Sequence, residues 1–451
     1  MYTKQLARFA HALAYEDLSP QAAALGRLCV EDLIGVALAG SACPQAQIWH
    51  NYFASGAQPK QAAAWAPQFP RIAYPQAAAL NAAYGHLLDL DDVHNGSIVH
   101  LGVVTIPAAI AVGSALHCSG RAVLAAVAAG YEVGARVGEA VNPESYRFWH
   151  TTGVVGALAS AAVSGKLMGL DEGQYLNALG SAGTQAAGLW EFLEDGAMSK
   201  ALHTANAALC GIRSAWLAAL GLTGASRILE GRRGLLRALT QEPHMEALVR
   251  DLDHTRLKIQ ENSFKSYACC RHIHGAAAAV AELMACRQVR PEDIIQITDR
   301  TYAAAKQVVD NPRPATLYAC KFSAQYCVAA LLLGSRLMAD AFQEPFASDP
   351  RLPPLMARVS VALDPALETE HLADPSRWPH IVEVTLQNGQ VLQKRVDDPP
   401  GDARNPFSQA EIDQKFYAMT AQLLSPADAE TLCGRIHNLD RLEDISQLFE
   451  L

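Results

Sequence analysis

The sequence has few charged and few aromatic residues for its length. Only 18% of the 451 residues are Asp, Glu, Lys or Arg, and 7% are aromatic. The formal net charge is −9, and no basic run or mixed basic and aromatic stretch occurs. Nucleic-acid binding requires a concentrated positive surface, so we expect no nucleic-acid partner. An acidic chain can still bind a small anion where a few cationic side chains converge.

The ten cysteines include no Cys-x-x-Cys pair. Because zinc sites and iron–sulfur clusters are typically marked by such spacings, we predict no metal site and no iron–sulfur cofactor. Cys269 and Cys270 are adjacent and cannot easily form one ordinary disulfide within regular structure. The pattern indicates reduced, mostly buried thiols, as expected for a cytoplasmic protein.

Long apolar runs are missing as well. The residues after Met1 form no apolar leader, so we expect no signal peptide. The longest uncharged stretch, 93–120, contains His94, His100 and Pro107, which a transmembrane helix would not normally carry. We interpret it as a loop followed by a buried helix, and we expect no membrane partner.

Alanine, leucine and valine instead recur at helical spacing through residues 1–260. Ser19 before Pro20 is typical of a helix start, and Gly40 marks the end of that helix. Small residues on these helical faces allow close helix packing. Further helices are predicted near residues 75–88, 103–117, 121–139, 151–168, 171–188 and 200–220.

After about residue 260 the composition changes to a mixture of helices and strands. Residues 381–396 alternate apolar and polar around Asn388-Gly389, which strongly indicates a hairpin. Other predicted elements are strands at 294–302 and 358–363, and helices at 274–286, 319–333, 408–424 and 426–436.

These patterns predict a mainly α protein with two domains. We expect a large all-helical domain over residues 1–265 and a smaller α+β lid domain over residues 266–401. The helices after 402 are expected to pack back on the helical domain.

Six ionisable side chains fall within fifteen residues of an otherwise apolar region. Burying a charge is costly unless it is paired or its pKa shifts, so such a cluster indicates acid–base chemistry or a metal site. The six are the carboxylates of Asp89, Asp91 and Asp92 and the imidazoles of His86, His94 and His100.

Two further stretches precede alanine-rich helices. Tyr146 and His150 lie before one of them, where the histidine could equally be a capping or core residue. Lys200 begins another helix that carries no charge until Arg213, so it points either to solvent or into a cleft. Because the sequence shows no partner for Lys200, we expect its removal to leave stability nearly unchanged.

A third stretch lies at the junction of the two predicted domains, where ligand sites are common. It contains Lys265, Cys270, Arg271, His272 and His274. The cations could bind carboxylates, although a polar linker explains the composition equally well. We favour Cys270 as a structural or pocket-lining thiol rather than a nucleophile.

Taken in order, these motifs resemble those of the MmgE/PrpD family. Asp89-Leu-Asp-Asp92 with His100 is similar to the family's Asp-Phe-Asp-Asp-Thr and His-Pro signature, and His150-Thr-Thr-Gly153 is similar to its His-x-Thr-x-x-Gly entry to a helix. Lys200, the segment from Lys265 through Cys270 to His274, and Lys321-Phe-Ser323 also match in order and spacing.

The resemblance implies a helical domain with an α+β lid, a homodimer, a site in the cleft between the domains, and no metal or organic cofactor. It implies catalytic roles for Asp89, His100, His150, Lys200 and Lys265, and substrate contacts for Arg271, His274, Cys270 and Tyr146. This chain departs from the family's Asp-Asp-Thr motif at Val93, and from the family's decarboxylase at Cys270 and Val308, where that enzyme has a histidine and a tyrosine.

We therefore expect a cofactor-free lyase that abstracts a proton next to a carboxylate of a small di- or tricarboxylate, most simply a 2-methylcitrate dehydratase-like hydro-lyase. His150 or His100 would act as base and acid, with Asp89 orienting one imidazole, and Lys200, Lys265 and Arg271 would hold carboxylates.

Several other functions stay open on the sequence alone. On the same scaffold they are an iminodisuccinate-type epimerase or isomerase and a cis-aconitate-type decarboxylase. More remote are a Mg²⁺-dependent helical prenyl-type synthase using the aspartates and a non-catalytic helical scaffold.

Overall fold

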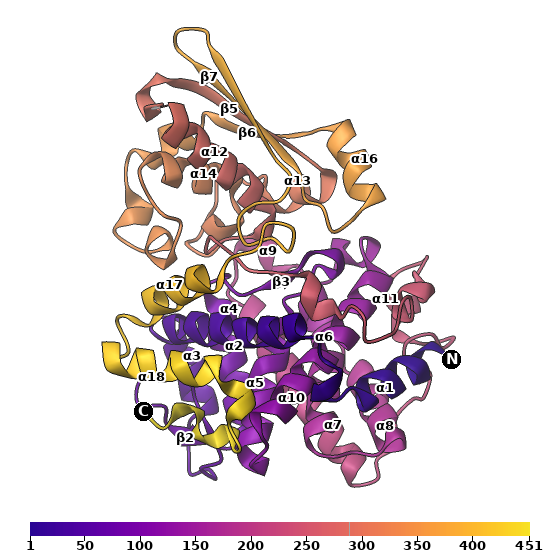
Figure 1. Ribbon diagram of the computed structural model, residues 1–451. Coiled ribbons are helices and arrows are strands. Elements are labelled where there is room, and N and C mark those ends of the chain that lie inside the picture. Colours follow the sequence, from indigo (N-terminus) through magenta and orange to yellow (C-terminus); the bar gives the residue numbers. More distant parts are fainter. Residues whose placement is uncertain (288) are drawn as a thin grey trace.

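The computed structural model describes every residue except Gln288. Figure 1 shows a helical body, by which we mean residues 1–265 and 402–451, below a smaller sheet part, residues 266–401. Both ends of the chain lie in the helical body. The predicted mainly α fold class is confirmed. Independent folding of the two parts, with boundaries at 265 and 401, stays a prediction.

The helices predicted in the body are present, and their starts follow local capping rules. Ser19 accepts a hydrogen bond from the amide of Ala22, as expected for the residue that caps a helix. The helices of the body before residue 265 are α1 (Tyr2–Ala12), α2 (Pro20–Ser41), α3 (Ala46–Phe53), α4 (Tyr74–Leu87), α5 (Leu101–Leu116), α6 (Gly120–Val141), α7 (Thr151–Leu167), α8 (Glu172–Gly183), α9 (Phe192–Asp195), α10 (Lys200–Ala219) and α11 (Leu235–Leu239).

Small side chains let the central helices approach closely. Helix α7 packs against α5, α6, α8 and α10, and it is buried over nearly its whole length. At Gly211 of α10 a Cβ atom would lie 2.5 Å from the backbone nitrogen of Ala161, so only glycine fits. This packing fixes where α7 and α10 begin, and both begin at the site described below.

The sheet part holds the predicted strands and hairpin. Its sheet has the order β6-β5-β7-β8, with β5 parallel to β6 and antiparallel to β7. Buried and partly exposed residues alternate along β7, and α12 covers β7 and β8 on the buried face. The elements are α12 (His274–Arg287), β5 (Ile294–Thr301), α13 (Ala303–Val309), α14 (Ala324–Leu332), α15 (Leu352–Met356), β6 (Val359–Leu363), α16 (Pro365–Ala373), β7 (His380–Leu386) and β8 (Val391–Val396).

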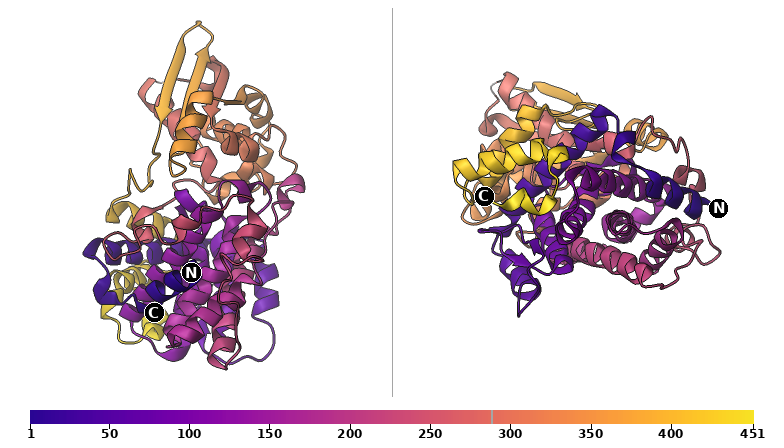
Figure 2. Two further views of the ribbon diagram at one scale, coloured as in Figure 1. Left: turned by 90° about the vertical axis from the view of Figure 1, so that its right-hand side faces the viewer. Right: turned by 60° about the horizontal axis from the view of Figure 1, so that its bottom comes forward.

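After the sheet part the chain returns to the body. Helices α17 (Gln409–Thr420) and α18 (Pro426–His437) both pack on α2, and Figure 1 shows them in yellow beside the indigo α2. The left view of Figure 2 shows the same return, with the hairpin at the far end of the molecule.

Two short strand pairs interrupt the helical body, and the sequence did not predict them. One pair joins β1 (Ala62–Ala63) to β2 (Arg71–Ile72). The other joins β3 (Val93–His94) to β4 (Asn262–Ser263), with Val93 opposite Ser263. The second pair brings the segment after Asp92 next to the segment before Lys265.

No helix in the described part of the chain combines the length and the apolar character needed to cross a bilayer. The uncharged stretch 93–120 forms a short loop and then the buried helix α5, as predicted.

Candidate active site

All the predicted site residues except His274 line a small pocket between the helical body and the sheet part. The free space among their side chains is about 20 Å³, close to the volume that one water molecule needs. The lining residues are Asp89, Val93, Ile98, His100, Tyr146, His150, Trp190, Lys200, Lys265, Cys270, Arg271, His272, Phe322 and Trp378. We call this space the inner pocket.

Asp89 lies between two ammonium groups at the edge of the inner pocket. Its backbone turns into the left-handed region, with φ of +54°, directly after α4. Lys200 Nζ lies 2.6 Å from Asp89 Oδ1, and Lys265 Nζ lies 3.2 Å from the same oxygen. Although burial alone would raise it, the two ammonium groups hold the pKa of Asp89 well below its ordinary value.

The carboxylate that contacts imidazoles is Asp91, not Asp89. His86 Nδ1 lies 2.8 Å from Asp91 Oδ2, and His100 Nδ1 lies 3.2 Å from the same oxygen. Our expectation that Asp89 orients an imidazole was therefore wrong, because the turn at Asp89 sends its carboxylate toward the lysines. Burial lowers the pKa of His86 to about 4, so this imidazole is neutral at physiological pH.

His150 lines the inner pocket, and only one of its two ring nitrogens has a partner among the described residues. It precedes α7, and its Nδ1 lies 3.0 Å from Nδ1 of His203. Its Nε2 is buried and has no hydrogen-bond partner within the described residues. Burial, with the charge of Lys200 nearby, holds the pKa of His150 well below its ordinary value. His150 is therefore a neutral imidazole, as a general base must be.

Asp92 belongs to the structure of the body rather than to the pocket. It accepts hydrogen bonds from the Tyr131 hydroxyl at 2.5 Å and the Gly102 amide at 3.1 Å, and burial raises its pKa to about 7. The three aspartates thus have three different sets of partners. They do not converge on one point as a magnesium–diphosphate site requires, which removes the basis of the synthase alternative.

The residues of the junction segment, 265–274, differ in whether they line the inner pocket and in what they contact. Arg271 lines the inner pocket, but its guanidinium already pairs with Asp402 at 2.8 Å. Cys270 also lines the pocket, and burial, together with the charge of Asp89, raises its pKa to about 12, so it is an unreactive thiol. His274 lies behind Arg271, contacting it through Nδ1 at 3.2 Å, and is not among the lining residues.

Several lining residues were not predicted. His272, Trp190, Phe322 and Trp378 form much of the wall. His272 stacks on Trp378, with ring centroids 4.2 Å apart, and contacts the Tyr302 hydroxyl at 2.6 Å. The sequence carried a signal for His272, which lies in the junction stretch, and for Phe322, which lies in the Lys321-Phe-Ser323 motif, but none for Trp190 and Trp378.

Lys321 is buried beside the pocket rather than in it. Its ammonium group donates to the carbonyls of Leu88 and Ala268 at 2.8 and 3.1 Å, and burial lowers its pKa to about 8. It ties the loop before Asp89 to the junction segment, so its contribution to the site is indirect.

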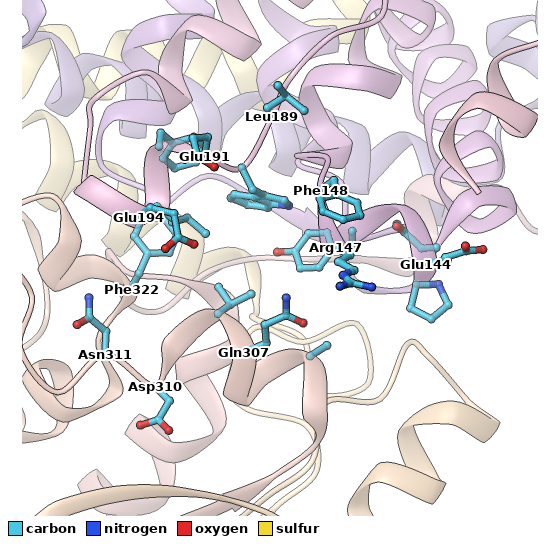
Figure 3. Close-up of a pocket in the computed structure, with 18 of the residues that line it drawn as sticks. Glu144, Arg147, Phe148, Leu189, Glu191, Glu194, Gln307, Asp310, Asn311 and Phe322 are labelled. Carbon is cyan, nitrogen blue, oxygen red and sulfur yellow. The ribbon is translucent and has the colours of Figure 1, made fainter. Parts of the chain in front are cut away.

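The inner pocket adjoins a much larger cavity of about 900 Å³ that shares Tyr146, Trp190 and Phe322 with it. Figure 3 shows this outer cavity, with Glu191 and Glu194 on one side and Gln307 and Asp310 on the other. Because its charged lining is mostly acidic, the outer cavity is a route or a vestibule rather than the place where a carboxylate is held.

The site as a whole is suited to proton transfer beside a carboxylate. A neutral imidazole with one unpartnered ring nitrogen lines a pocket that is also lined by two buried lysines. Their ammonium groups also disfavour a metal cation at Asp89, although donor atoms of His86, Asp89 and His100 all lie within 4.8 Å of one another.

Comparison with known proteins agrees with these features. A family model described as the MmgE/PrpD N-terminal domain matches residues 4–248, and one described as the MmgE/PrpD C-terminal domain matches residues 267–440.

Individual relatives are enzymes. The chain is similar to human (Homo sapiens) cis-aconitate decarboxylase, with 28% identity covering 100% of this chain and 94% of the relative. It is 24% identical to the Aspergillus terreus cis-aconitate decarboxylase, over 100% of the chain and 95% of the relative. It is 27% identical to 2-methylcitrate dehydratase from Cupriavidus necator, over 63% of the chain and 61% of the relative.

Proposed function

Because the chain belongs to the MmgE/PrpD family and is an enzyme of the lyase class, we propose that it removes or delivers a proton at the carbon next to a carboxylate of a small di- or tricarboxylate. The leading candidate is a hydro-lyase of the 2-methylcitrate dehydratase type that needs no cofactor.

One observation carries the proposal. Among the described residues His150 Nε2 is buried without a hydrogen-bond partner, and His150, Lys200 and Lys265 all line the inner pocket. An unsatisfied buried imidazole nitrogen costs free energy, and functional sites are where such a cost is retained. When Nε2 is the base, His150 Nδ1 carries the proton and donates it to Nδ1 of His203, which lies 3.0 Å away.

In the proposed dehydration, His150 Nε2 takes the proton from the carbon next to the carboxylate. The negative charge that builds up on that carboxylate is stabilised by Lys200 and Lys265. His100, held near Asp91, gives a proton to the departing hydroxyl group, which leaves as water. The carbon–hydrogen and carbon–oxygen bonds break, and a carbon–carbon double bond forms.

A second candidate is decarboxylation of a tricarboxylate such as cis-aconitate. It is favoured by the full-length similarity to cis-aconitate decarboxylases. In this reaction the carbon–carboxylate bond breaks, carbon dioxide leaves, and a histidine protonates the carbon. The histidine and the tyrosine of the decarboxylase are replaced here by Cys270 and Val308, which weakens the match to that enzyme.

The test is an NMR screen in D₂O with citrate, 2-methylcitrate, cis-aconitate and amino-dicarboxylates. We expect deuterium to enter at the carbon next to a carboxylate, together with either water loss or carbon dioxide release. His150→Gln should abolish the exchange, whereas the exposed His117→Gln should not. Absence of exchange with every compound would contradict the proposal.

We further propose that the working form is a homodimer. The outer face of α10 exposes Leu202, Trp216, Leu217 and Leu220. Exposed apolar faces of this kind commonly mark contacts between subunits, and most such contacts join identical chains.

A further inference from the structure

Four side chains with metal-binding atoms converge where α17 and α18 pack on α2, outside the inner pocket. They are Glu31 of α2, Asp413 of α17, and Cys433 and His437 of α18. One donor atom from each lies within 4.8 Å of those of the other three. Glu31 and Cys433 are buried, whereas Asp413 and His437 are partly exposed, so the cluster opens to solvent on one side.

Two of the four measured distances fall in the range of a tetrahedral ion site, and the other two are slightly shorter. Bonds of about 2.0 to 2.3 Å from zinc to oxygen, nitrogen and sulfur place neighbouring donors roughly 3.3 to 3.8 Å apart. His437 Nε2 lies 3.1 Å from Glu31 Oε2, 3.2 Å from Asp413 Oδ1 and 3.4 Å from Cys433 Sγ. Cys433 Sγ lies 3.8 Å from Glu31 Oε1.

The cluster has too few positive charges. Within the residues that the structure describes, no lysine or arginine lies within 4.0 Å of the carboxylates of Glu31 or Asp413. Two neighbouring carboxylates, one of them fully buried, repel each other unless a cation or a proton lies between them.

The cluster also has too few N–H hydrogens for the close contacts among its polar atoms. The amide nitrogen of Gln409 lies 3.0 Å from Glu31 Oε2, 2.6 Å from Asp413 Oδ1 and 2.9 Å from His437 Nε2. An amide nitrogen carries two hydrogens and cannot serve three acceptors. If His437 Nε2 instead carries its own hydrogen, two donors face each other. An ion in place of this nitrogen removes the conflict.

We infer that Glu31, Asp413, Cys433 and His437 bind one zinc ion that fastens the C-terminal helices to α2. The mixture of sulfur, nitrogen and carboxylate donors in fourfold arrangement fits zinc better than calcium or magnesium, which prefer oxygen. Cys433 and His437 are four residues apart on one helix and therefore share its face, as paired ligands on a helix must. With four protein ligands the site is closed, which is typical of a structural rather than a catalytic ion.

The ion would act on the rigidity of α17. Lys415, two residues after the ligand Asp413, contacts Asp32 at 2.6 Å and the Leu90 carbonyl at 3.1 Å. Fixing α17 on α2 therefore also fixes this contact with the residue that follows Asp89. The inference does not depend on which reaction the inner pocket performs.

The test is metal binding by the full-length protein after removal of metals with a chelator. We expect one zinc per chain, and with Co²⁺ a thiolate-to-cobalt charge-transfer band and the strong visible absorption of a tetrahedral site. Cys433→Ser should abolish the band, while Cys286→Ser, which alters an exposed cysteine, should leave it unchanged. His437→Gln should weaken binding by more than about tenfold, since even residues behind a ligand contribute that much.

Zinc should also raise the melting temperature of the wild-type protein but not of Cys433→Ser. If the metal-free wild-type protein binds neither Zn²⁺ nor Co²⁺, or if the cobalt spectrum lacks the thiolate band, the inference is overturned and the cluster is held by a shared proton. The wild-type measurement decides this even if the variants fail to fold.

Discussion

At the scale of single residues, the site depends on charges that are buried together. Asp89, Lys200 and Lys265 are almost fully removed from solvent, and each of the lysines is held by the carboxylate or by backbone carbonyls. Burying these charges lowers the free energy of unfolding, but it holds the charged groups in fixed positions. Substitutions here should therefore change both catalysis and stability.

Lys200→Met should reduce kcat by about 10²- to 10³-fold, because one preorganised cation at the developing negative charge is lost. The sequence alone led us to expect unchanged stability, and the 2.6 Å contact with Asp89 shows that expectation to be wrong. Removing one partner of a buried pair costs about 3 to 5 kcal/mol. Since Lys265 stays near Asp89, we expect a value near the lower end, measured by urea unfolding.

The double substitution Asp89→Asn and Lys200→Met should regain most of the stability but none of the activity. Lys60→Met, on the surface, is the matched control and should change neither quantity. Wild-type turnover in Lys200→Met would remove Lys200 from the catalytic site.

The pH dependence should report the state of His150. Its pKa in the folded protein is lowered by burial and by the charge of Lys200. A base with a lowered pKa stays unprotonated as the pH falls through 6.5, so the acidic limb of kcat/KM should lie below pH 6.5. A limb at or above pH 6.5 would contradict the assignment of His150 as the base.

At the scale of elements, α17 is linked to the segment that follows Asp89. Lys415 reaches from α17 to the buried carboxylate of Asp32 on α2 and to the carbonyl of Leu90. Burial raises the pKa of Asp32 even with this ammonium group beside it. The helix is therefore anchored by a charge pair as well as by its apolar face.

Lys415→Met should destabilise the protein by about 3 kcal/mol, because it leaves the Asp32 carboxylate buried without a counter-charge. The added change Asp32→Asn should recover most of this loss. Lys394 lies on β8 of the hairpin and pairs at the surface with Glu282 of α12. Lys394→Met, which removes this pair, should cost less than about 1 kcal/mol of stability. Equal effects of the two lysine substitutions in chemical unfolding would argue against the anchoring role.

The sequence predicted the elements well where their pattern is local. The Asn388-Gly389 hairpin is present, with Gly389 at φ of +83°, and the predicted helices end within a few residues of those observed. The helix predicted at 319–333 is instead a short 3₁₀ turn followed by α14, because Ser323 caps α14 and restarts the helix.

Partners that depend on distant segments could not be predicted. Asp91, and not Asp89 as predicted, contacts the imidazoles because the backbone turns into the left-handed region at Asp89. No pattern in the sequence requires this turn. His203 and Trp378 meet site residues only through packing of separate helices and loops. The cluster of Glu31, Asp413, Cys433 and His437, here called the Glu31 cluster, draws on three helices. Its one local ligand spacing, Cys433 and His437 four residues apart, is too little to identify it from the sequence.

At the scale of the whole molecule, the inner pocket lies between two parts of the chain, and the Glu31 cluster lies within the helical body. Reaction and metal binding should therefore be separable. We expect activity at 25 °C to survive EDTA, because the proposed proton transfers use only side chains of this chain, while the melting temperature falls. Activity lost on chelation and restored by Mg²⁺ or Zn²⁺ would contradict the proposed mechanism.

The proposed homodimer can be tested through α10. Leu220 is the most exposed apolar residue on its outer face, and Leu220→Asp should convert the dimer to a monomer in light scattering because a charge would be buried in the contact. Leu372→Asp, on an exposed position of α16, should leave the mass unchanged. A wild-type protein that is monomeric at micromolar concentration would contradict the proposal.

The spacing of the site residues along the chain has a consequence for protein synthesis. Asp89 lies 111 residues before Lys200 and 176 residues before Lys265. At about 5 to 20 residues per second, a ribosome needs roughly 10 to 35 seconds to deliver the second ammonium group after the carboxylate. Until then the growing chain supplies at most one of the two counter-charges of Asp89, so the catalytic centre is assembled late, and a product truncated before residue 265 has no complete centre.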